Sequence, residues 1–460
     1  MKNKRFLLGM LVIALVFGTT IIGCDDSDDD SKKPEPDIPP YIPSVPDDLT
    51  GTVSITGNPT KGSVLTADTS SLDGSGTITY RWKRGDTQTA INTTIGTNSS
   101  TYTLTANEQG KYVAVTVSRE GYSGSVTSTA IFINAMTWIQ ATTTGFSAGA
   151  NDGKFHINNV AYGNNQWVAV CNTGYVTYST DGQTWTSVFL GTAGSAIFTD
   201  GTFSLDIYGI AYGSGKWIAV GNKGKMATST NGSDWTEITG SPFGATQINT
   251  VIYGGGVWFA GGNNGSIAYS SNGTTWTKVT DGPFGYNDIQ SIAYGNGKWI
   301  AVGANGKMYT TTSGNTGSSW TSVDVTSLFT YSVGGSSGTV QTIQTVAYAN
   351  NRWIAAGGGG KMATSTDGQN WTAVTDNTFG PATIKTIAYG NSRWVAAGGQ
   401  DLLGSPIGSA KIAVSKNGID WTSIPDTSFV GSDQINGIAF GNNKWVAVSS
   451  NVKIAYADDN

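Results

Sequence analysis

The side chains best placed for chemistry are polar residues that recur at the start of a repeated strand. In each repeat one polar residue enters the strand and another lies two positions further on. The entering residues are His156, Asp206, Gln247, Asp288, Thr342, Thr383 and Gln434. The second set is Asn158, Tyr208, Asn249, Gln290, Gln344, Lys385 and Asn436. If these strands surround an axis, the two sets form polar rings at a channel mouth, where a ligand could bind. A solvated rim would have the same composition.

Two carboxylates in these rings could serve glycoside hydrolysis, which needs a pair about 5–9.5 Å apart. Asp206 and Asp288 occupy matching positions two repeats apart, which is too distant without help from loops. His156 is the only histidine, so a Ser-His-Asp site would have to include it. The Cys and His spacing of a zinc site is absent from the sequence. We therefore assign no catalytic residue, metal or cofactor, and an enzymatic function stays open.

The strands that would position these residues come from one repeated phrase, Trp-[Ile/Val/Phe]-Ala followed by small residues. The phrase occurs seven times, at Trp167, Trp217, Trp258, Trp299, Trp353, Trp394 and Trp445. A second Trp follows six of them, at Trp185, Trp235, Trp276, Trp320, Trp371 and Trp421. A period of about 41 residues with room for four short strands predicts a β-propeller. We expect the repeated Trp residues to pack between blades rather than to bind sugar.

The turn before the second Trp supports a family resemblance. Ser179–Trp185 resembles the Asp-box of sialidase-type (BNR) propellers, and four other repeats carry the same hairpin. The resemblance implies that a Ser and an Asp or Asn cap the turn between the third and fourth strands. The Asp or Asn positions are Asp181, Asn231, Asn272, Asp367 and Asn417. A sialidase needs three arginines for its substrate, but the repeat region has only Arg352 and Arg393, both before a Trp in an expected turn, so sialidase activity is excluded. Photosystem-assembly-type propellers share the repeat pattern, and fold alone does not choose among these functions.

The last repeat lacks its fourth strand. Ile435–Tyr456 supplies three strands, whereas Met136–Gln140 matches the fourth strand of the second repeat, Asp234–Ile238. We therefore expect an all-β fold in which the segment around Trp138 closes a seven-bladed propeller at its C-terminal end, which removes an exposed sheet edge.

Three connections are longer than the others. Leu190–Leu205 and Ser322–Thr342 join a fourth strand to the next first strand, and Gln400–Ala410 joins a second strand to a third. In an up-and-down blade both kinds of loop lie on one face. Long loops on a rigid scaffold often bind ligands, although loop length also drifts without a function.

The segment before the repeats has strand-like alternation and resembles the disulfide-free bacterial immunoglobulin-like (Ig-like) domains. Trp82 takes the position of their core Trp, Tyr112 that of their tyrosine corner, and Ala114 that of a disulfide Cys. Arg84-Gly85-Asp86 is expected in a hairpin loop, where it could be an integrin ligand, but Gly-Asp is also an ordinary turn sequence.

The N-terminus has the features of an export signal. Basic residues precede an apolar run, Phe6–Ile22, and the Gly23-Cys24 ending resembles a lipobox, in which Cys24 carries the lipid anchor. An uncleaved signal anchor is the alternative. The acidic, Pro-rich segment that follows should stay extended. The chain has a formal net charge of −5, concentrated in that segment, so no electrostatic footprint for nucleic acid is present.

The sequence thus predicts a signal peptide (1–23), a tether (24–48), an Ig-like domain (49–134) and a seven-bladed propeller (135–460). We expect a protein lipid-anchored in the bacterial cell envelope, at the outer membrane or cell surface, which binds a protein or a glycan. The alternative is a carbohydrate-active hydrolase or lyase.

Overall fold

The computed structural model describes most of the chain after residue 45. The described residues are 46–133, 136–144, 156–191, 197–280, 282–313, 319–332, 338–375, 378–401, 410–424, 428–429 and 434–459. The predicted signal peptide 1–23, Cys24 and nearly all of the tether 24–48 lie outside them. Asp48–Asn460 forms a compact unit separate from Met1–Asp47. No helix in the described ranges is long and apolar enough to span a bilayer.

The first part of the compact unit consists of two antiparallel sheets. One contains β1 (Ser54–Thr56), β2 (Val64–Asp68) and β5 (Thr101–Thr103). The other contains β4 (Thr93–Ile95), β3 (Ile78–Gly85), β6 (Tyr112–Arg119), β7 (Val126–Thr127) and β8 (Ile131–Phe132), and a short 3-10 turn, η1 (Ala106–Glu108), precedes β6. Trp82 is fully buried between them, and its indole N–H donates a hydrogen bond to the Ser99 carbonyl at 2.9 Å. The prediction that Trp82 is a core residue is confirmed.

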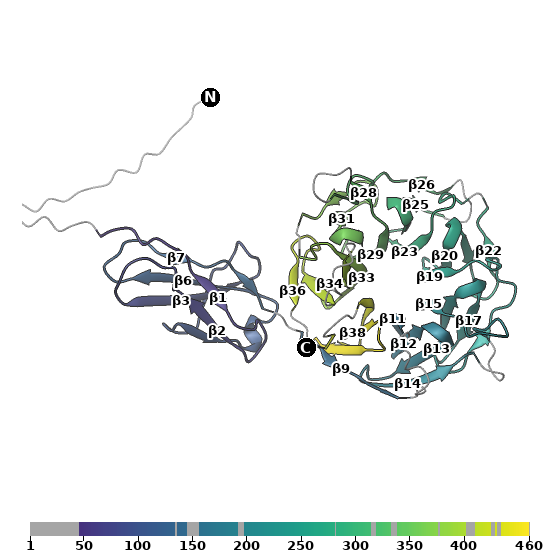
Figure 1. Cartoon of the computed structure of the whole chain (residues 1–460), viewed down its shortest axis with the longest axis horizontal. Helices are drawn as coiled ribbons and strands as arrows, with labels where there is room; N and C mark the ends of the chain where they lie inside the picture. The colour runs from purple at the N-terminus through teal and green to yellow at the C-terminus, as the bar shows by residue number, and fades with distance from the viewer. Residues whose placement is uncertain are drawn as a thin grey trace, which may run out of the picture. The chain divides into compact units, whose positions relative to one another are not determined.

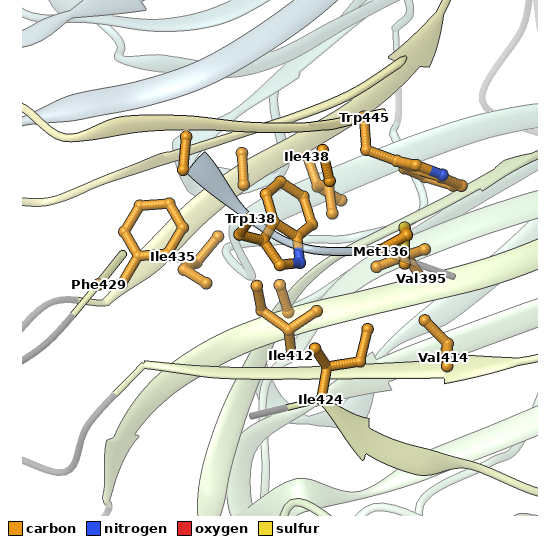
Figure 2. Packing of buried hydrophobic residues seen from close by; sticks show 14 of the residues in the cluster. Met136, Trp138, Val395, Ile412, Val414, Ile424, Phe429, Ile435, Ile438 and Trp445 are labelled. Carbon is orange, nitrogen blue, oxygen red and sulfur yellow. The ribbon is translucent and has the colours of Figure 1, made fainter. Parts of the chain in front are cut away.

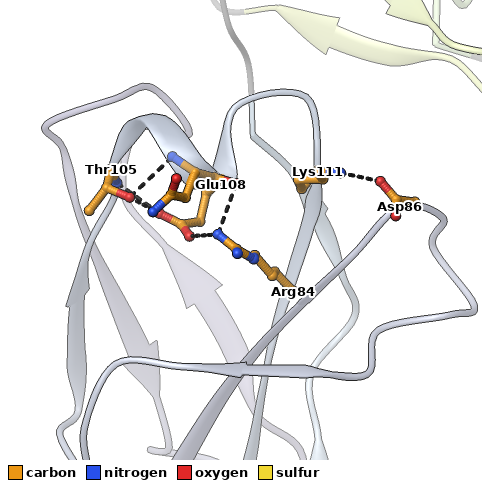
Figure 3. Close-up of polar contacts among 6 residues, drawn as sticks. Arg84, Asp86, Thr105, Glu108 and Lys111 are labelled. Carbon is orange, nitrogen blue, oxygen red and sulfur yellow. Dashed lines mark hydrogen bonds and ion pairs between the residues drawn. The ribbon is translucent and has the colours of Figure 1, made fainter.

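Arg84-Gly85-Asp86 is held by ion pairs within this sandwich (Figure 3). Arg84 and Gly85 are not in a loop, as the sequence had suggested, but form the end of β3, which pairs with β6. Arg84 Nη1 lies 2.7 Å from Oε1 of Glu108, whose side chain is buried. Asp86 pairs with Lys111. The Arg84 guanidinium thus satisfies a buried carboxylate of the sandwich, whereas the Asp86 side chain is exposed.

The second part of the compact unit contains seven successive sheets of four or five strands. The first comprises β11 (Ile157–Gly163), β12 (Gln166–Cys171), β13 (Tyr175–Ser179) and β14 (Thr184–Phe189), with β10 (Thr142–Thr144) parallel to β14. The second comprises β15 (Ile207–Gly213), β16 (Lys216–Gly221), β17 (Met226–Ser229) and β18 (Thr236–Glu237). The third comprises β19 (Ile248–Gly254), β20 (Val257–Gly262), β21 (Ile267–Ser270) and β22 (Thr277–Lys278). The fourth comprises β23 (Ile289–Gly295), β24 (Lys298–Gly303), β25 (Met308–Thr311) and β26 (Thr321–Ser322).

The remaining sheets follow the same plan. The fifth comprises β29 (Ile343–Ala349), β30 (Arg352–Gly357), β31 (Met362–Ser365) and β32 (Thr372–Ala373), and a small hairpin, β27 (Thr330–Tyr331) and β28 (Thr339–Val340), precedes it. The sixth comprises β33 (Ala382–Gly390), β34 (Arg393–Asp401), β35 (Lys411–Ser415) and β36 (Thr422–Ile424). The seventh comprises β37 (Ile435–Gly441), β38 (Lys444–Ser449), β39 (Ile454–Asp458) and β9 (Ile139–Gln140). Short 3-10 turns join second to third strands in the first five sheets: η3 (Asn172–Gly174), η4 (Asn222–Gly224), η5 (Asn263–Gly265), η6 (Ala304–Gly306) and η8 (Gly358–Gly360).

The sheets stand in a ring with their first strands innermost (Figure 1). The next-to-last residue of each first strand is an aromatic that packs on the first Trp of its own sheet, as in the pair Tyr212–Trp217, whose ring centroids are 5.0 Å apart. In every sheet but the fifth, which has Ala349 there, the first strand ends in a Gly that faces the aromatic of the next sheet, where a Cβ would clash; Gly163 faces Tyr212 in this way. Gly441 of the last sheet faces Tyr162 of the first, so the ring is closed.

The N-terminal strand β9 completes the last sheet. Its pairing with β39 is antiparallel, with Ile139 opposite Tyr456. Trp138 is buried beside Ile412, Ile438 and other apolar residues of the last two sheets (Figure 2). The closing strand predicted from the sequence is confirmed.

The repeated Trp residues build the core. All seven first-set Trp side chains are at most 3% exposed. In the first three sheets, the second Trp donates its indole N–H to the Gly carbonyl of its own hairpin, as Trp185 does to Gly182 at 3.1 Å. The expectation that these Trp residues pack in the core is confirmed for the buried members.

The ring has two faces, defined by their turns. On the loop face the first strands begin and the second-to-third turns lie, since the backbone N–H of Thr173 in η3 donates to Asp206 just before β15 at 2.9 Å. On the hairpin face lie the third-to-fourth hairpins. There Lys216, which begins β16, donates to the Asn272 carbonyl in the hairpin of the next sheet at 2.8 Å. The residue before each first-set Trp therefore begins a strand, not a turn as predicted, and Lys216 and Lys298 join neighbouring sheets through it.

Candidate ligand-binding site

A polar cavity of about 310 Å³ lies at the centre of the ring. Residues at the start of the first strand of every sheet line it, so it opens toward the loop face. All seven members of the second predicted ring line the cavity: Asn158, Tyr208, Asn249, Gln290, Gln344, Lys385 and Asn436. Of the first ring only Gln247 does.

A β-bulge explains why the lining is richer than the sequence suggested. The pairing of every first strand with its second strand shifts register near its start, as between Ile157 and Asn159 in β11. A bulge places two residues opposite one, so two consecutive side chains can turn the same way. Five further lining residues follow directly after ring members: Asn159, Thr250, Ser291, Thr345 and Thr386. Strict alternation would have pointed them away, and no sequence signal marks the bulge.

The acidic residues of the first ring join sheets instead of facing the cavity. Asp206 Oδ1 accepts from the backbone N–H of Thr173, and Asp288 Oδ1 accepts from that of Asn264, both at 2.9 Å. Thr173 and Asn264 have positive φ, at 56° and 51°. These carboxylates therefore satisfy turn amides in the preceding sheet.

The other first-ring residues also have backbone roles. His156 forms an isolated bridge with Ser450, and its N–H donates to Asn172 Oδ1 at 2.9 Å. The N–H of Gln434 donates to Ser450 Oγ at 3.0 Å. The Thr342 carbonyl accepts from the N–H of Gly358, and Thr383 is buried within β33. The structure thus does not bring this ring together around one ligand.

Three asparagines of the second ring fasten adjacent sheets. Asn158, Asn249 and Asn436 donate through Nδ2 to carbonyls of Ile207, Ile289 and Ile157 at 2.8, 2.9 and 3.0 Å. Each of these carbonyls belongs to the first strand of the following sheet. One amide atom of each Asn is thereby committed to the fold.

Lys385 is the only charged side chain among the described residues that line the cavity. Its Nζ donates to Oε1 of Gln344 in the preceding sheet at 3.3 Å. Burial lowers the pKa of Lys385. Tyr208 is neutral, because burial and the Asp206 charge raise its pKa to about 12, and its hydroxyl donates to Asp206 Oδ2 at 3.1 Å.

A second cavity, of about 460 Å³, lies where the predicted long connection Ser322–Thr342 crosses the loop face. Leu328 and Tyr331 line it from that connection, and Gly359 and Lys361 line it from the second-to-third turn of the fifth sheet. The ammonium of Lys361 lies 5.8 Å from the Tyr331 ring centroid. Part of each of the three long connections lies outside the described residues.

Exposed aromatic side chains stand on the loop-face connections. Tyr286 is 91% exposed before the fourth sheet, and Phe203 is 71% exposed before the second. Connections of this kind also bury an aromatic residue that was not predicted from the sequence, as at Phe243, Phe284 and Phe379. The repeated Phe-Gly pair at these positions was a visible signal.

Metal binding has no geometric support in the described residues, among which no group of three or more His, Cys, Asp or Glu could hold an ion. No carboxylate is among the described residues that line the central cavity either. The cavity can therefore bind a ligand through hydrogen bonds and through the charge of Lys385. The described side chains offer the ligand no acid–base pair.

No protein-family model matches the chain, and no curated protein sequence does. Among solved structures, the chain is similar to one described as YCF48 bound to D1 peptide, with a TM-score of 0.52 and 16% identity, over 72% of this chain and 97% of that one. The fold is a β-propeller. YCF48 from Cyanidioschyzon merolae gives 16% identity and a TM-score of 0.49, over 70% of this chain and 98% of that one. Virginiamycin B lyase from Staphylococcus aureus gives 12% identity and a TM-score of 0.47, over 70% of this chain and 99% of that one. At these identities the likeness concerns the propeller fold alone.

Proposed function

We propose that this protein is an exported, membrane-tethered binding or scaffold protein that engages a polypeptide through the loop face of its propeller. In this proposal the propeller has seven blades of the BNR/Asp-box type, and the Ig-like domain is a spacer behind a lipid anchor at Cys24. One observation carries the binding role. The central cavity is lined by amides, hydroxyls and one lysine, and exposed aromatics stand on the connections of the same face.

Support for a polypeptide ligand comes from the chemistry of the lining. Asn and Gln side chains offer both donors and acceptors, which matches the alternating N–H and C=O groups of a peptide backbone. Exposed Tyr286 and Phe203 supply apolar contact area, and aromatic residues are enriched in protein interfaces. The solved YCF48 structure was obtained with a peptide bound, which is consistent with peptide binding on this fold.

The hydrolase or lyase alternative receives less support. Asp206 and Asp288, the carboxylates considered for it, accept backbone hydrogen bonds from neighbouring turns. An acid–base pair has to reach the ligand.

Binding of the full-length protein in detergent to a peptide array and a glycan array tests the proposal. We expect peptide binding, lost when Phe203→Ala and Tyr286→Ala are combined. Ile419→Ala is the matched control, because Ile419 is 40% exposed but lies in a third-to-fourth hairpin on the hairpin face. Equal loss in the control, or binding to glycans alone, contradicts the proposal. Glycan turnover that disappears in Asp206→Asn or Asp288→Asn would establish the enzyme instead.

Lipid anchoring has its own test. Growth with an alkyne fatty acid should label the wild type and place it in the membrane fraction. Cys24→Ser should lose the label, and Cys171→Ser should keep it, since Cys171 is buried. A Cys24→Ser protein that keeps the label refutes the anchor.

A further inference from the structure

One sector of the central cavity differs from the sheets that contribute Asn. Asn158, Asn249 and Asn436 each use Nδ2 to fasten the next sheet. The corresponding residues of the fourth, fifth and sixth sheets are Gln290, Gln344 and Lys385. These three side chains come from consecutive sheets and are longer than Asn. One sector of the wall is therefore built from longer side chains, and the only cation of the described lining lies there.

Lys385 is a half-buried cation without a counter-charge among the described residues. Its one hydrogen bond is to a neutral amide, Gln344, at 3.3 Å, and no ion pair of the described residues includes it. Even the partial removal of an ammonium from water is unfavourable when no counter-charge lies nearby. The lowered pKa of Lys385 reflects this burial. An anion in the cavity would restore the missing interaction.

We infer that the sector formed by Lys385, Gln344 and Gln290 binds the C-terminal carboxylate of a polypeptide. This inference rests on the proposed function and names the ligand group for the central cavity. Lys385 supplies the charge, the Gln amides supply neutral donors, and Thr345 and Thr386 line the wall beside them. A charge-assisted hydrogen bond is stronger than a neutral one, so the carboxylate end would be the anchor of the ligand.

A peptide end fits this cavity better than an acidic sugar. Sugar sites commonly offer a flat aromatic face. The one aromatic residue among the described lining is Tyr208, whose hydroxyl is engaged by Asp206. A volume of about 310 Å³ admits a few residues of chain. The rest of a longer ligand would then leave across the loop face toward the exposed aromatics.

The test uses full-length protein in detergent and two fluorescent probes. One is a degenerate hexapeptide pool with a free C-terminal carboxylate, and the other is the same pool with a C-terminal amide. We expect the carboxylate pool to bind at least about tenfold more tightly, because a hydrogen bond to a charged group is worth that factor or more. Lys385→Met should abolish the difference and Lys385→Arg should largely keep it. Lys278→Met is the matched control, since Lys278 is exposed on β22.

The outcomes separate this inference from the proposed function. If the two pools bind the wild type with equal affinity, and bind the Lys385→Met variant with that same affinity, the propeller binds peptides but the carboxylate assignment is wrong. If neither pool binds, both proposals fail. If galacturonate or glucuronate oligomers bind in a Lys385-dependent way while peptides do not, the anion is a sugar acid and the peptide assignment is overturned. Protection of Lys385 from acetic anhydride by the carboxylate pool, read by mass spectrometry, should accompany binding; bound carboxylate pool with unprotected Lys385 would place the anion elsewhere.

Discussion

Arg393 and Asp459 form a buried ion pair, with Nη2 and Oδ1 3.1 Å apart, between the sixth sheet and the residue that follows β39. In earlier sheets the equivalent cations, Lys216 and Lys298, donate to a carbonyl in the hairpin of the next sheet. The last sheet lacks that hairpin because its fourth strand comes from β9. Asp459 takes the place of the hairpin, and it also accepts from the Trp445 indole at 2.9 Å.

Removal of the Asp459 carboxylate should therefore weaken the ring strongly. We expect Asp459→Ala to lower the free energy of unfolding by about 3 kcal/mol, because the Arg393 guanidinium would stay buried without a partner. Asp458→Ala is the control, since the Asp458 side chain is half exposed and its pairing with Lys444 should be worth under about 1 kcal/mol. Urea unfolding measures both, and equal losses would refute the role of Asp459.

Ring closure predicts a steric effect at Gly441. A Cβ there would lie 2.1 Å from the Tyr162 ring, so Gly441→Ala should cost about 1–3 kcal/mol. Ala349→Gly is the reverse control, because the fifth sheet carries Ala at the matching position and should lose only about 0.5–1 kcal/mol of backbone entropy. Thermal unfolding compares them. A Gly441→Ala protein as stable as wild type would mean that the first and last sheets are not in contact.

The closing strand can be tested through Trp138. Trp138→Ala should reduce the free energy of unfolding by about 3–5 kcal/mol, since the side chain is buried in the core shown in Figure 2. Ile139→Ala, at the neighbouring residue, should change the free energy of unfolding by under about 1 kcal/mol, because the Ile139 side chain is 46% exposed. Circular dichroism in urea provides the comparison, and matching effects would contradict the closure.

The hairpin carboxylate Asp181 predicts a pH effect. Burial works against it, but hydrogen bonds from the Thr184 and Gln183 N–H groups hold the pKa of Asp181 below its usual value. Because the folded pKa is depressed, its stabilisation is present above the unfolded pKa of about 4 and is lost as the pH falls through the folded value. Asp181→Asn should keep the turn, as Asn231 does in the second sheet, and flatten this acid dependence.

Asp181→Ala should instead cost about 1 kcal/mol at neutral pH, because the capping oxygen is lost. Melting temperatures of wild type and both variants between pH 3 and pH 7 would distinguish the cases. An Asn variant whose stability falls with acid as steeply as wild type would show that another group is responsible.

The sequence predicted what repetition and alternation encode. Equivalent Trp, Gly and Asx residues marked strands and turns, and the likeness of Met136–Gln140 to an internal strand located the closing segment, which pairs as expected. The second ring, including Lys385, lies at the cavity because alternation holds at its position.

The misses have local causes that alternation does not record. The bulge in each first strand turned Thr345 and Thr386 into lining residues. Strand β3 is longer than the sequence suggested, so Arg84 lies within it and pairs with the buried Glu108 carboxylate. The sequence suggests Asp206 and Asp288 as possible ligand groups because their hydrogen-bond donors are not close to them in the sequence. These donors are the backbone N–H groups of Thr173 and Asn264, which lie in turns of the preceding sheet.

The pairing of Ile139 with Tyr456 determines when the seventh sheet can form during synthesis of the chain. A ribosome releases the β39 residues only after the roughly 300 residues that follow β9 have emerged, which takes on the order of tens of seconds. Throughout that time β9 lacks its partner strand β39, so the seventh sheet cannot form from the segment already synthesised. The seventh sheet can therefore form only after β39 has been synthesised, and a deletion of β39 would leave β9 without its strand partner.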